Sequence, residues 1–308
     1  MQRISIVAVA VLLGCGERLA ATPGEIDVVA PKNPRVVRVA AVNTTVSTGL
    51  LDALLPDFTA ASGLDIELLG ADEVSEGKRG RGHKLFEAAR AGQVDLIIAH
   101  YGKPDVVPFV SEGLGELPRL VFANQVALIG PADDPAQIAG MSDAAQALAK
   151  IAAVGAPYIV NNLDGLKYLS SVLWHAADQP ERGSWYIEAE EGKARAVRLA
   201  EERGGYVLFG VQPFLHFKNK HDSDMEILVW RDPLLQRAMA TIVVSPERVR
   251  GVNHAGALAL QRYLLSAPVQ AKIRAFRMSG NDQQFWWPMA RNNNPTELLP
   301  TSDANPGD

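Results

Sequence analysis

Residues 35–58 read RVVRVAAVNTTVSTGLLDALLPDF, and the first eight of them form an apolar, β-prone run. Residues 43–49 (NTTVSTG) then gather Thr and Ser side chains, and residues 50–58 form an amphipathic helical segment. A buried strand would thus lead through a polar loop into a helix N-terminus, where backbone N–H groups and the helix dipole favour an anion. Plain capping of the helix by Ser47 or Thr48 suits the same pattern, so spacing alone leaves both interpretations open.

Short apolar runs alternate with amphipathic segments along the rest of the chain, which is typical of an α/β protein with mostly parallel sheets. Strands are expected at residues 35–42, 66–69, 95–99, 121–130, 158–160, 206–209, 227–230 and 240–244. Helices are expected at residues 49–61, 83–91, 142–154, 166–177, 192–203 and 255–276.

Two of the expected segments, 121–130 and 227–244, look like connections between two lobes. They predict a first lobe of residues 35–124 plus 240–299 and a second lobe of residues 128–228. A cleft between two lobes is a natural ligand site. Ligands of α/β sheets bind beyond the carboxyl ends of strands, which is where residues 43–49 fall.

The N-terminus has the features of an export signal. Residues 1–14 combine Arg3 with an apolar core that is too short to span a bilayer, and they predict a signal peptide. Residues 12–15 (LLGC) resemble a bacterial lipobox, with Leu13 where a smaller residue is usual, so we expect lipidation of Cys15; ordinary cleavage near residues 19–21 is the alternative. Residues 15–34 would then be a tether and residues 300–308 a disordered tail. Since Cys15 is the single cysteine, the body has no thiol to mispair in an oxidising compartment.

Composition and motifs argue against several functions. The net charge of −5 over 308 residues does not suggest a nucleic-acid-binding face. No nucleophile elbow, P-loop or dinucleotide fingerprint is present, so we expect no enzyme and no cofactor. His216 and His221 lie near Asp222 and Asp224, a weak metal pattern for which loop or surface placement is favoured. The aromatic residues 285–288 (FWWP) are expected to pack on the first lobe, with docking to a permease as the alternative.

Several motifs together resemble one family. They are residues 43–51 (NTTVSTGLL), 54–58 (LLPDF), 80–85 (GRGHKL), 92–100 (GQVDLIIAH), 124–131 (NQVALIGP) and 134–136 (DPA). With Trp174, Trp185 and Tyr186, they resemble the extracytoplasmic tungstate-binding proteins of ABC transporters, a branch of the type II periplasmic binding proteins. The resemblance covers residues 37–291.

The resemblance carries expectations of fold, location and partner. It implies a two-lobed α/β fold, in which each lobe has a central, mostly parallel sheet flanked by helices and two crossing strands join the lobes. It also implies a periplasmic or extracytoplasmic protein, lipid-anchored if Cys15 is modified, that delivers a small anion to an ABC permease. The expected ligand is a tungstate- or molybdate-like oxyanion held in the cleft between the lobes.

The second ligand loop of that family departs from its pattern here. Where the family has approximately SRGDxSGT, residues 160–166 read VNNLDGL, so Asn161 stands at the arginine position. An arginine offers an oxyanion a charged fork, whereas asparagine offers a neutral amide. Gln125 likewise stands where the family has Asp. A basic loop at residues 78–84 (KRGRGHK) suggests that Arg81 replaces the lost charge, although it also suits a solvated loop beside Asp72, Glu73 and Glu76.

These observations lead to one hypothesis for the site and one rival. The expected ligand-binding residues are Thr44, Thr45 and Ser47 from one lobe, Asn161 and Asn162 from the other, and Arg81 as charge partner. The rival is a ligand-sensing or partner-binding protein on the same scaffold that has lost tungstate binding.

Overall fold

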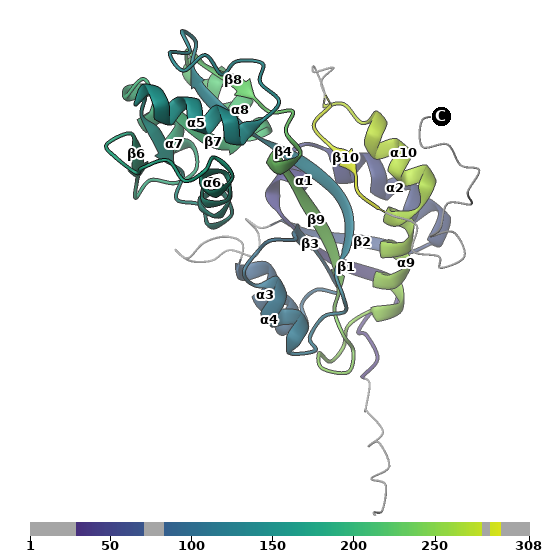
Figure 1. The fold of residues 1–308 in the computed structure, drawn as a ribbon. Helices are drawn as coiled ribbons and strands as arrows, with labels where there is room; N and C mark the ends of the chain where they lie inside the picture. Colours follow the sequence, from purple (N-terminus) through teal and green to yellow (C-terminus); the bar gives the residue numbers. More distant parts are fainter. Residues whose placement is uncertain (1–28, 71–82, 279–283, 291–308) are drawn as a thin grey trace, which may run out of the picture.

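The computed structural model describes residues 29–70, 83–278 and 284–290. Within them, ten strands form one connected sheet in the order β2-β1-β3-β9-β4-β7-β5-β6, and β8 and β10 also pair with β4. Figure 1 shows two lobes, with the long strands β4 and β9 running between them. The chain therefore has the expected two-lobed α/β fold, each lobe with a central sheet and flanking helices.

The first lobe is built on a parallel trio of strands. β1 pairs with β2 and β3 in parallel, and β9 lies antiparallel to β3, between β3 and β4. These strands are β1 (Val36–Ala41), β2 (Asp65–Gly70), β3 (Leu96–His100) and β9 (Gln236–Val243). The helices are α1 (Asn43–Ser47), α2 (Leu50–Ser62), α3 (His83–Arg90), α4 (Val106–Ser111), α9 (His254–Leu265) and α10 (Ala267–Ala275). β1 and β3 read as nearly continuous apolar runs because helices cover both faces of a parallel sheet.

The second lobe repeats this plan. β5 pairs in parallel with β6 on one side and with β7 on the other. The strands are β5 (Tyr158–Val160), β6 (Tyr186–Glu188), β7 (Tyr206–Gly210) and β8 (Met225–Val229). The helices are α5 (Ala144–Val154), α6 (Asp164–Ala176), α7 (Ala194–Glu202) and α8 (Val211–His221).

β4 (Arg119–Pro131) belongs to both lobes. Its first half pairs with β9, and its second half pairs with β7 and β8. The chain returns to the first lobe through residues 230–235, which include the 3₁₀ turn η1 (Pro233–Leu235). The buried Gln125 donates its side-chain amide to the carbonyl of Trp230, and so ties the first crossing to the second. The Gln125 side chain therefore belongs to the junction of the lobes.

Several elements differ from the sequence prediction. Residues 43–49 are not a loop, because Asn43–Ser47 form the short helix α1 before α2. The helix expected at residues 255–276 is two helices, since Ser266 is extended and Pro268 lies in the first turn of α10. α4, α8, β6 and β10 (Trp287–Pro288) were not predicted. The helix at residues 49–61 is observed as α2, which continues through Pro56.

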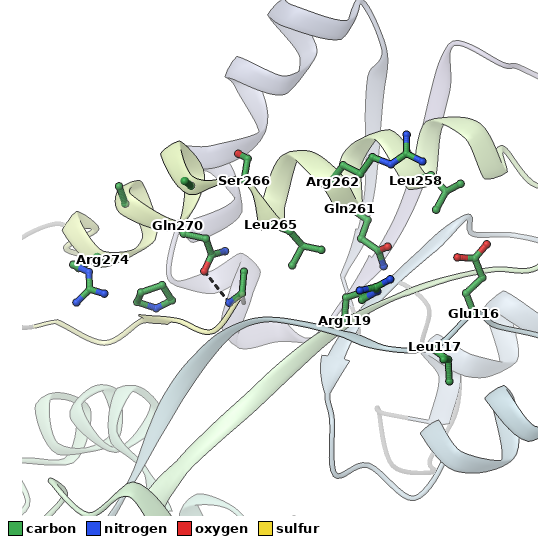
Figure 2. A pocket seen from close by; sticks show the side chains of 14 residues that line it. Glu116, Leu117, Arg119, Leu258, Gln261, Arg262, Leu265, Ser266, Gln270 and Arg274 are labelled. Atoms are coloured by element: carbon green, nitrogen blue, oxygen red, sulfur yellow. Dashed lines mark hydrogen bonds between the residues drawn. The ribbon is translucent and has the colours of Figure 1, made fainter. Parts of the chain in front are cut away.

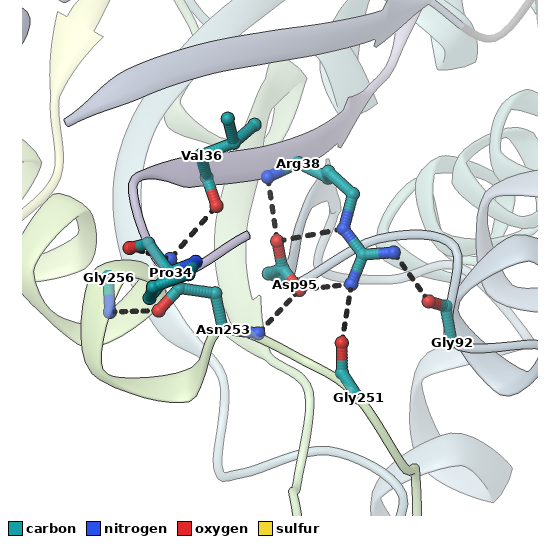
Figure 3. A network of polar contacts seen from close by, with 8 residues as sticks. All are labelled: Pro34, Val36, Arg38, Gly92, Asp95, Gly251, Asn253 and Gly256. Carbon is teal, nitrogen blue, oxygen red and sulfur yellow. Dashed lines mark hydrogen bonds and ion pairs between the residues drawn. The ribbon is translucent and has the colours of Figure 1, made fainter. Parts of the chain in front are cut away.

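A buried ion pair holds the first lobe together (Figure 3). Asp95, fully buried just before β3, accepts hydrogen bonds from the backbone N–H and the guanidinium of Arg38 on β1. Its other contact is the backbone N–H of Asn253, at 2.8 Å, where α9 begins. The Asp95 carboxylate thereby joins β1, β3 and α9.

The aromatic cluster near the C-terminus packs as expected. Phe285 and Trp286 are buried, and the Trp286 ring meets Phe122 edge-on with centroids 5.1 Å apart. The Trp286 indole N–H donates to the Thr48 hydroxyl at 3.2 Å, just after α1. This segment therefore braces the α1–α2 junction.

Across residues 29–70, 83–278 and 284–290, no helix has the length and apolar character needed to cross a membrane.

Candidate functional site

A cavity of about 920 Å³ is lined by residues of both lobes. The first lobe contributes residues of α1 and the loop after β3, and the second contributes the starts of α6 and α7 and the length of α8. The lining residues are Val42, Asn43, Ser47, Lys103, Leu163, Lys193, Ala194, Phe209, Gln212, Pro213, His216, Phe217, Lys220 and His221. The starts of α1, α7 and α8 thus meet one space, and the positive ends of helix dipoles favour anions there.

The charge of this lining is one-sided. It includes Lys103, Lys193 and Lys220 with His216 and His221, and none of the described lining residues is acidic. Burial lowers the pKa of Lys103 from its usual value, and nearby Arg237 lowers it further, whereas Asp105 and Asp164 oppose this. The cavity is therefore suited to a negatively charged ligand.

The three predicted residues of α1 have different surroundings. Thr45 is fully buried, and its hydroxyl donates to the carbonyl of Val42 at 2.7 Å, so its hydrogen is already used. Ser47 is exposed and lines the cavity. Thr44 is half-buried and borders a narrow crevice with Gln212 and Trp286. Within the described part of the chain, no acceptor occupies the hydroxyl of Thr44 or of Ser47.

Asn161 is fully buried, and its amide is engaged on every side. Its oxygen accepts from the Lys193 backbone N–H at 2.9 Å, and its nitrogen donates to the carbonyls of Lys193 and Leu208. The residue at the family's arginine position thus holds the loop before α7. Its neighbour Asn162 is exposed, donates to the Glu190 carbonyl at 3.0 Å, and keeps a further amide hydrogen.

Lys193 has an unusual backbone conformation. Its φ of 61° and ψ of −140° lie in a region that glycine normally occupies, and it precedes the first residue of α7. Asn161 bonds both the N–H and the carbonyl of this residue, so the conformation is held from outside. The Lys193 side chain lines the cavity.

Lys103 and Lys193 were missed in the sequence. Lys103 lies three residues beyond His100, the last residue of β3, and so at the carboxyl end of a parallel strand, a signal that could have identified it. No local signal identifies Lys193, because its place depends on the contact with Asn161. Two predicted residues, Arg81 and Cys15, lie outside the described residues, as do residues 1–28 and 300–308.

Metal binding has no support from the described residues, among which no cluster of three His, Cys, Asp or Glu side chains could hold an ion. His216 and His221 lie on α8 and line the cavity. They therefore lie beside the lysines of this cavity.

A second cavity, of about 1070 Å³, lies within the first lobe between α9, α10 and β4 (Figure 2). The arginines of its lining, Arg119, Arg262 and Arg274, are all exposed. The side of α9 lines it together with the start of α10, at Ser266 and Ala267. Unlike the first cavity, it is lined by residues of one lobe only, and its lining includes the acidic Glu116.

Comparison with known proteins places this geometry in a family. No protein-family model matches the chain. It is 31% identical over 261 residues to a Haloferax volcanii protein named "Putative ABC transporter anion-binding protein", covering 83% of this chain and 72% of that one. It is 27% identical over 282 residues to the tungstate-binding protein TupA of Peptoclostridium acidaminophilum, covering 89% and 93% of the two chains.

Solved structures agree. The tungstate-binding protein TupA of Desulfovibrio alaskensis has a TM-score of 0.70 at 29% identity, over 85% of this chain and all of that one. The tungstate ABC transporter protein of Geobacter sulfurreducens has a TM-score of 0.59 at 26% identity, over 76% of this chain and 95% of that one. The chain therefore belongs to the family of anion-binding proteins of ABC transporters that includes the tungstate-binding proteins.

Proposed function

We propose that this protein is the extracytoplasmic solute-binding component of an ABC importer and binds a small oxyanion, of the tungstate or molybdate type, between its lobes. Family members are solute-binding proteins rather than enzymes, and relatives carry tungstate or anion binding in their names. The partner would be a membrane permease. No chemical step is involved.

The observation that carries this proposal is the one-sided charge of the cavity. Three lysines line it, and no described lining residue is acidic. Lys103 and Lys193 come from opposite lobes, so an anion between them would draw the lobes together. Of the predicted neutral donors, Ser47 lines this cavity, whereas Thr44 and Asn162 do not and would have to approach the anion as the lobes close.

The volume of the cavity indicates an open state. An oxyanion with four oxygens occupies about as much space as four waters, ~120 Å³. A cavity of about 920 Å³ must therefore narrow around such a ligand. Two crossing strands are the kind of hinge that permits this closure.

Calorimetry and thermal shift with tungstate, molybdate, sulfate, phosphate and small organic acids test the proposal. We expect tungstate or molybdate to raise the melting temperature at micromolar concentration, because a ligand at 100 times its Kd adds about 2.7 kcal/mol to the free energy of unfolding. The double variant Lys103→Gln/Lys193→Gln should lose most of this response. Lys150→Gln is the matched control, since Lys150 is exposed on α5, away from the cavity.

Absence of any response to tungstate or molybdate at millimolar concentration would contradict the proposal. A response to an organic acid alone would instead favour the rival, a sensor on the same scaffold that has lost tungstate binding.

A further inference from the structure

Arg237 lies on β9, where this strand crosses between the lobes, and its side chain reaches α6 of the second lobe. A Cβ built on Gly165, in the first turn of α6, would lie 2.9 Å from the Arg237 Cζ, and closer still to one terminal nitrogen. The guanidinium therefore packs directly on the backbone of Gly165. Only a residue without a side chain leaves room for it there.

This first turn of α6 has backbone donors to spare. The helix has 13 residues, and its N-cap residue Leu163 provides no side-chain acceptor. Leu166 and Lys167 donate their N–H groups to the Leu163 carbonyl. Among the described residues, no acceptor meets the N–H of Asp164 or of Gly165. The guanidinium thus lies at the positive end of a helix dipole, where a cation is unfavourable on its own.

The charge of Arg237 has no partner in the described part of the chain. No hydrogen bond or ion pair to its guanidinium is formed there, and burial lowers its pKa from the usual value. Even so, an arginine stays protonated in proteins. A half-buried, unpaired guanidinium is costly unless a partner of opposite charge arrives.

Two further groups near Arg237, Lys103 and His100, also suggest a site for a negatively charged partner. Lys103 is close enough to Arg237 for their charges to interact, and it lines the cavity. The Nδ1 atom of His100, at the end of β3, is buried and has no hydrogen-bond partner among the described residues. Burial, and then Arg237 and Lys103, hold the pKa of His100 well below its usual value, so its ring is neutral near pH 7. Asp105 and the exposed Asp164 are the carboxylates whose charges act on Lys103, and among the described residues Asp164 forms no ion pair with Arg237 or Lys103.

We infer that Arg237, together with Lys103, binds the negative charge of the oxyanion at the first turn of α6. The inference rests on the proposed function and names the residues that replace the arginine absent from residues 160–166. The guanidinium of Arg237 would donate hydrogen bonds to the anion, and the backbone N–H groups of Asp164 and Gly165 would donate further hydrogen bonds to it. Since Lys103 belongs to the first lobe and α6 to the second, the same contact would hold the lobes closed.

The test measures tungstate and molybdate affinity of the full chain by calorimetry. Arg237→Gln is expected to weaken binding about 10- to 100-fold, the usual effect of losing charged hydrogen bonds. Arg237→Lys keeps the charge but loses the two-pronged guanidinium, so its affinity should lie between that of the unaltered protein and that of Arg237→Gln. Affinity of Arg237→Gln should also depend less on salt. Arg119→Gln, an exposed arginine of the second cavity, is the matched control and should stay within about twofold of the unaltered protein, in line with the small effect of exposed charges.

Gly165→Ala separates binding from folding. Alanine favours a helix over glycine, so the melting temperature of the free protein should not fall. Its methyl group would displace the Arg237 guanidinium, so affinity should fall as in Arg237→Gln. Unchanged affinity in Arg237→Gln, with binding by the unaltered protein intact, would overturn the inference and leave the proposed function standing. Failure of the unaltered protein to bind either anion would overturn both.

Discussion

Replacing Asp95 by alanine is expected to lower the free energy of unfolding by about 3–5 kcal/mol, the cost of breaking a buried ion pair by removing one partner. Asp95 is fully buried, and it accepts from the Arg38 N–H at 2.7 Å, from its guanidinium at 2.6 Å and from the Asn253 N–H at 2.8 Å. The truncation leaves these donors without their acceptor. Urea unfolding of the full chain, followed by circular dichroism, measures the change.

The control for this prediction is the exposed pair of Arg90 and Glu112. Glu112→Ala should leave the unfolding midpoint unchanged, because surface ion pairs contribute little. A loss below about 1 kcal/mol for Asp95→Ala, similar to an ordinary hydrogen bond, would contradict the assignment of Asp95 as the joint of β1, β3 and α9. We also expect the joint to affect binding, since β3 leads directly to His100 and to the proposed ligand residue Lys103.

The fold followed from the sequence wherever a local pattern and tertiary packing agree. β1 was predictable because most of its residues are buried on both faces, which makes it an apolar run interrupted only by Arg38. α8 was missed although its sequence VQPFLHFKNKH carries helix signals, namely a proline in the first turn, apolar residues at positions 211, 214 and 217, and basic residues in the last turn. The helix α1 was also missed. A run of Thr and Ser disfavours a helix, and this one depends on the Thr45 and Thr48 hydroxyls bonding back to the chain.

The site was predictable only in part. The polar residues after β1 do contribute Asn43 and Ser47 to the cavity, as strand-end reasoning suggested. The predicted charge partner, Arg81, lies outside the described residues and stays a prediction. The charged groups that we propose, Lys193 and Arg237, could not be identified from a motif, because a motif shows which residues are adjacent in sequence, whereas these two are positioned by contacts with Asn161 and Gly165. Asn161 had been assigned as a ligand residue, yet its amide is spent on the Lys193 backbone, so we now expect it to act as a positioning residue.

Asn161→Ala is therefore expected to lower the free energy of unfolding by about 2–4 kcal/mol, as when buried backbone groups lose their partners. The amide is fully buried and serves the N–H and carbonyl of Lys193 together with the carbonyl of Leu208. Tungstate affinity should fall as well, because Lys193 would no longer be held toward the cavity. Unfolding in urea and calorimetry measure the two effects separately, and Gln146→Ala, which removes a single exposed side-chain hydrogen bond on α5, is the control.

Lys193→Gly, unlike Asn161→Ala, should not lower the free energy of unfolding, but like Asn161→Ala it should weaken tungstate binding. Glycine relieves a backbone conformation that costs a lysine about 1–3 kcal/mol, and this gain offsets the greater freedom of glycine in the unfolded chain. The free energy of unfolding should thus stay level or rise, while tungstate affinity falls about tenfold with the loss of one charge. If the variant bound tungstate as tightly as the unaltered protein, Lys193 would be a structural residue only. If the variant bound tungstate weakly but was also destabilised, the backbone conformation of Lys193 at φ 61° would not be a strained one that the Asn161 contacts maintain. Weaker tungstate binding without loss of stability is therefore the result that would support a role of the Lys193 charge in binding rather than a role of Lys193 in the loop alone.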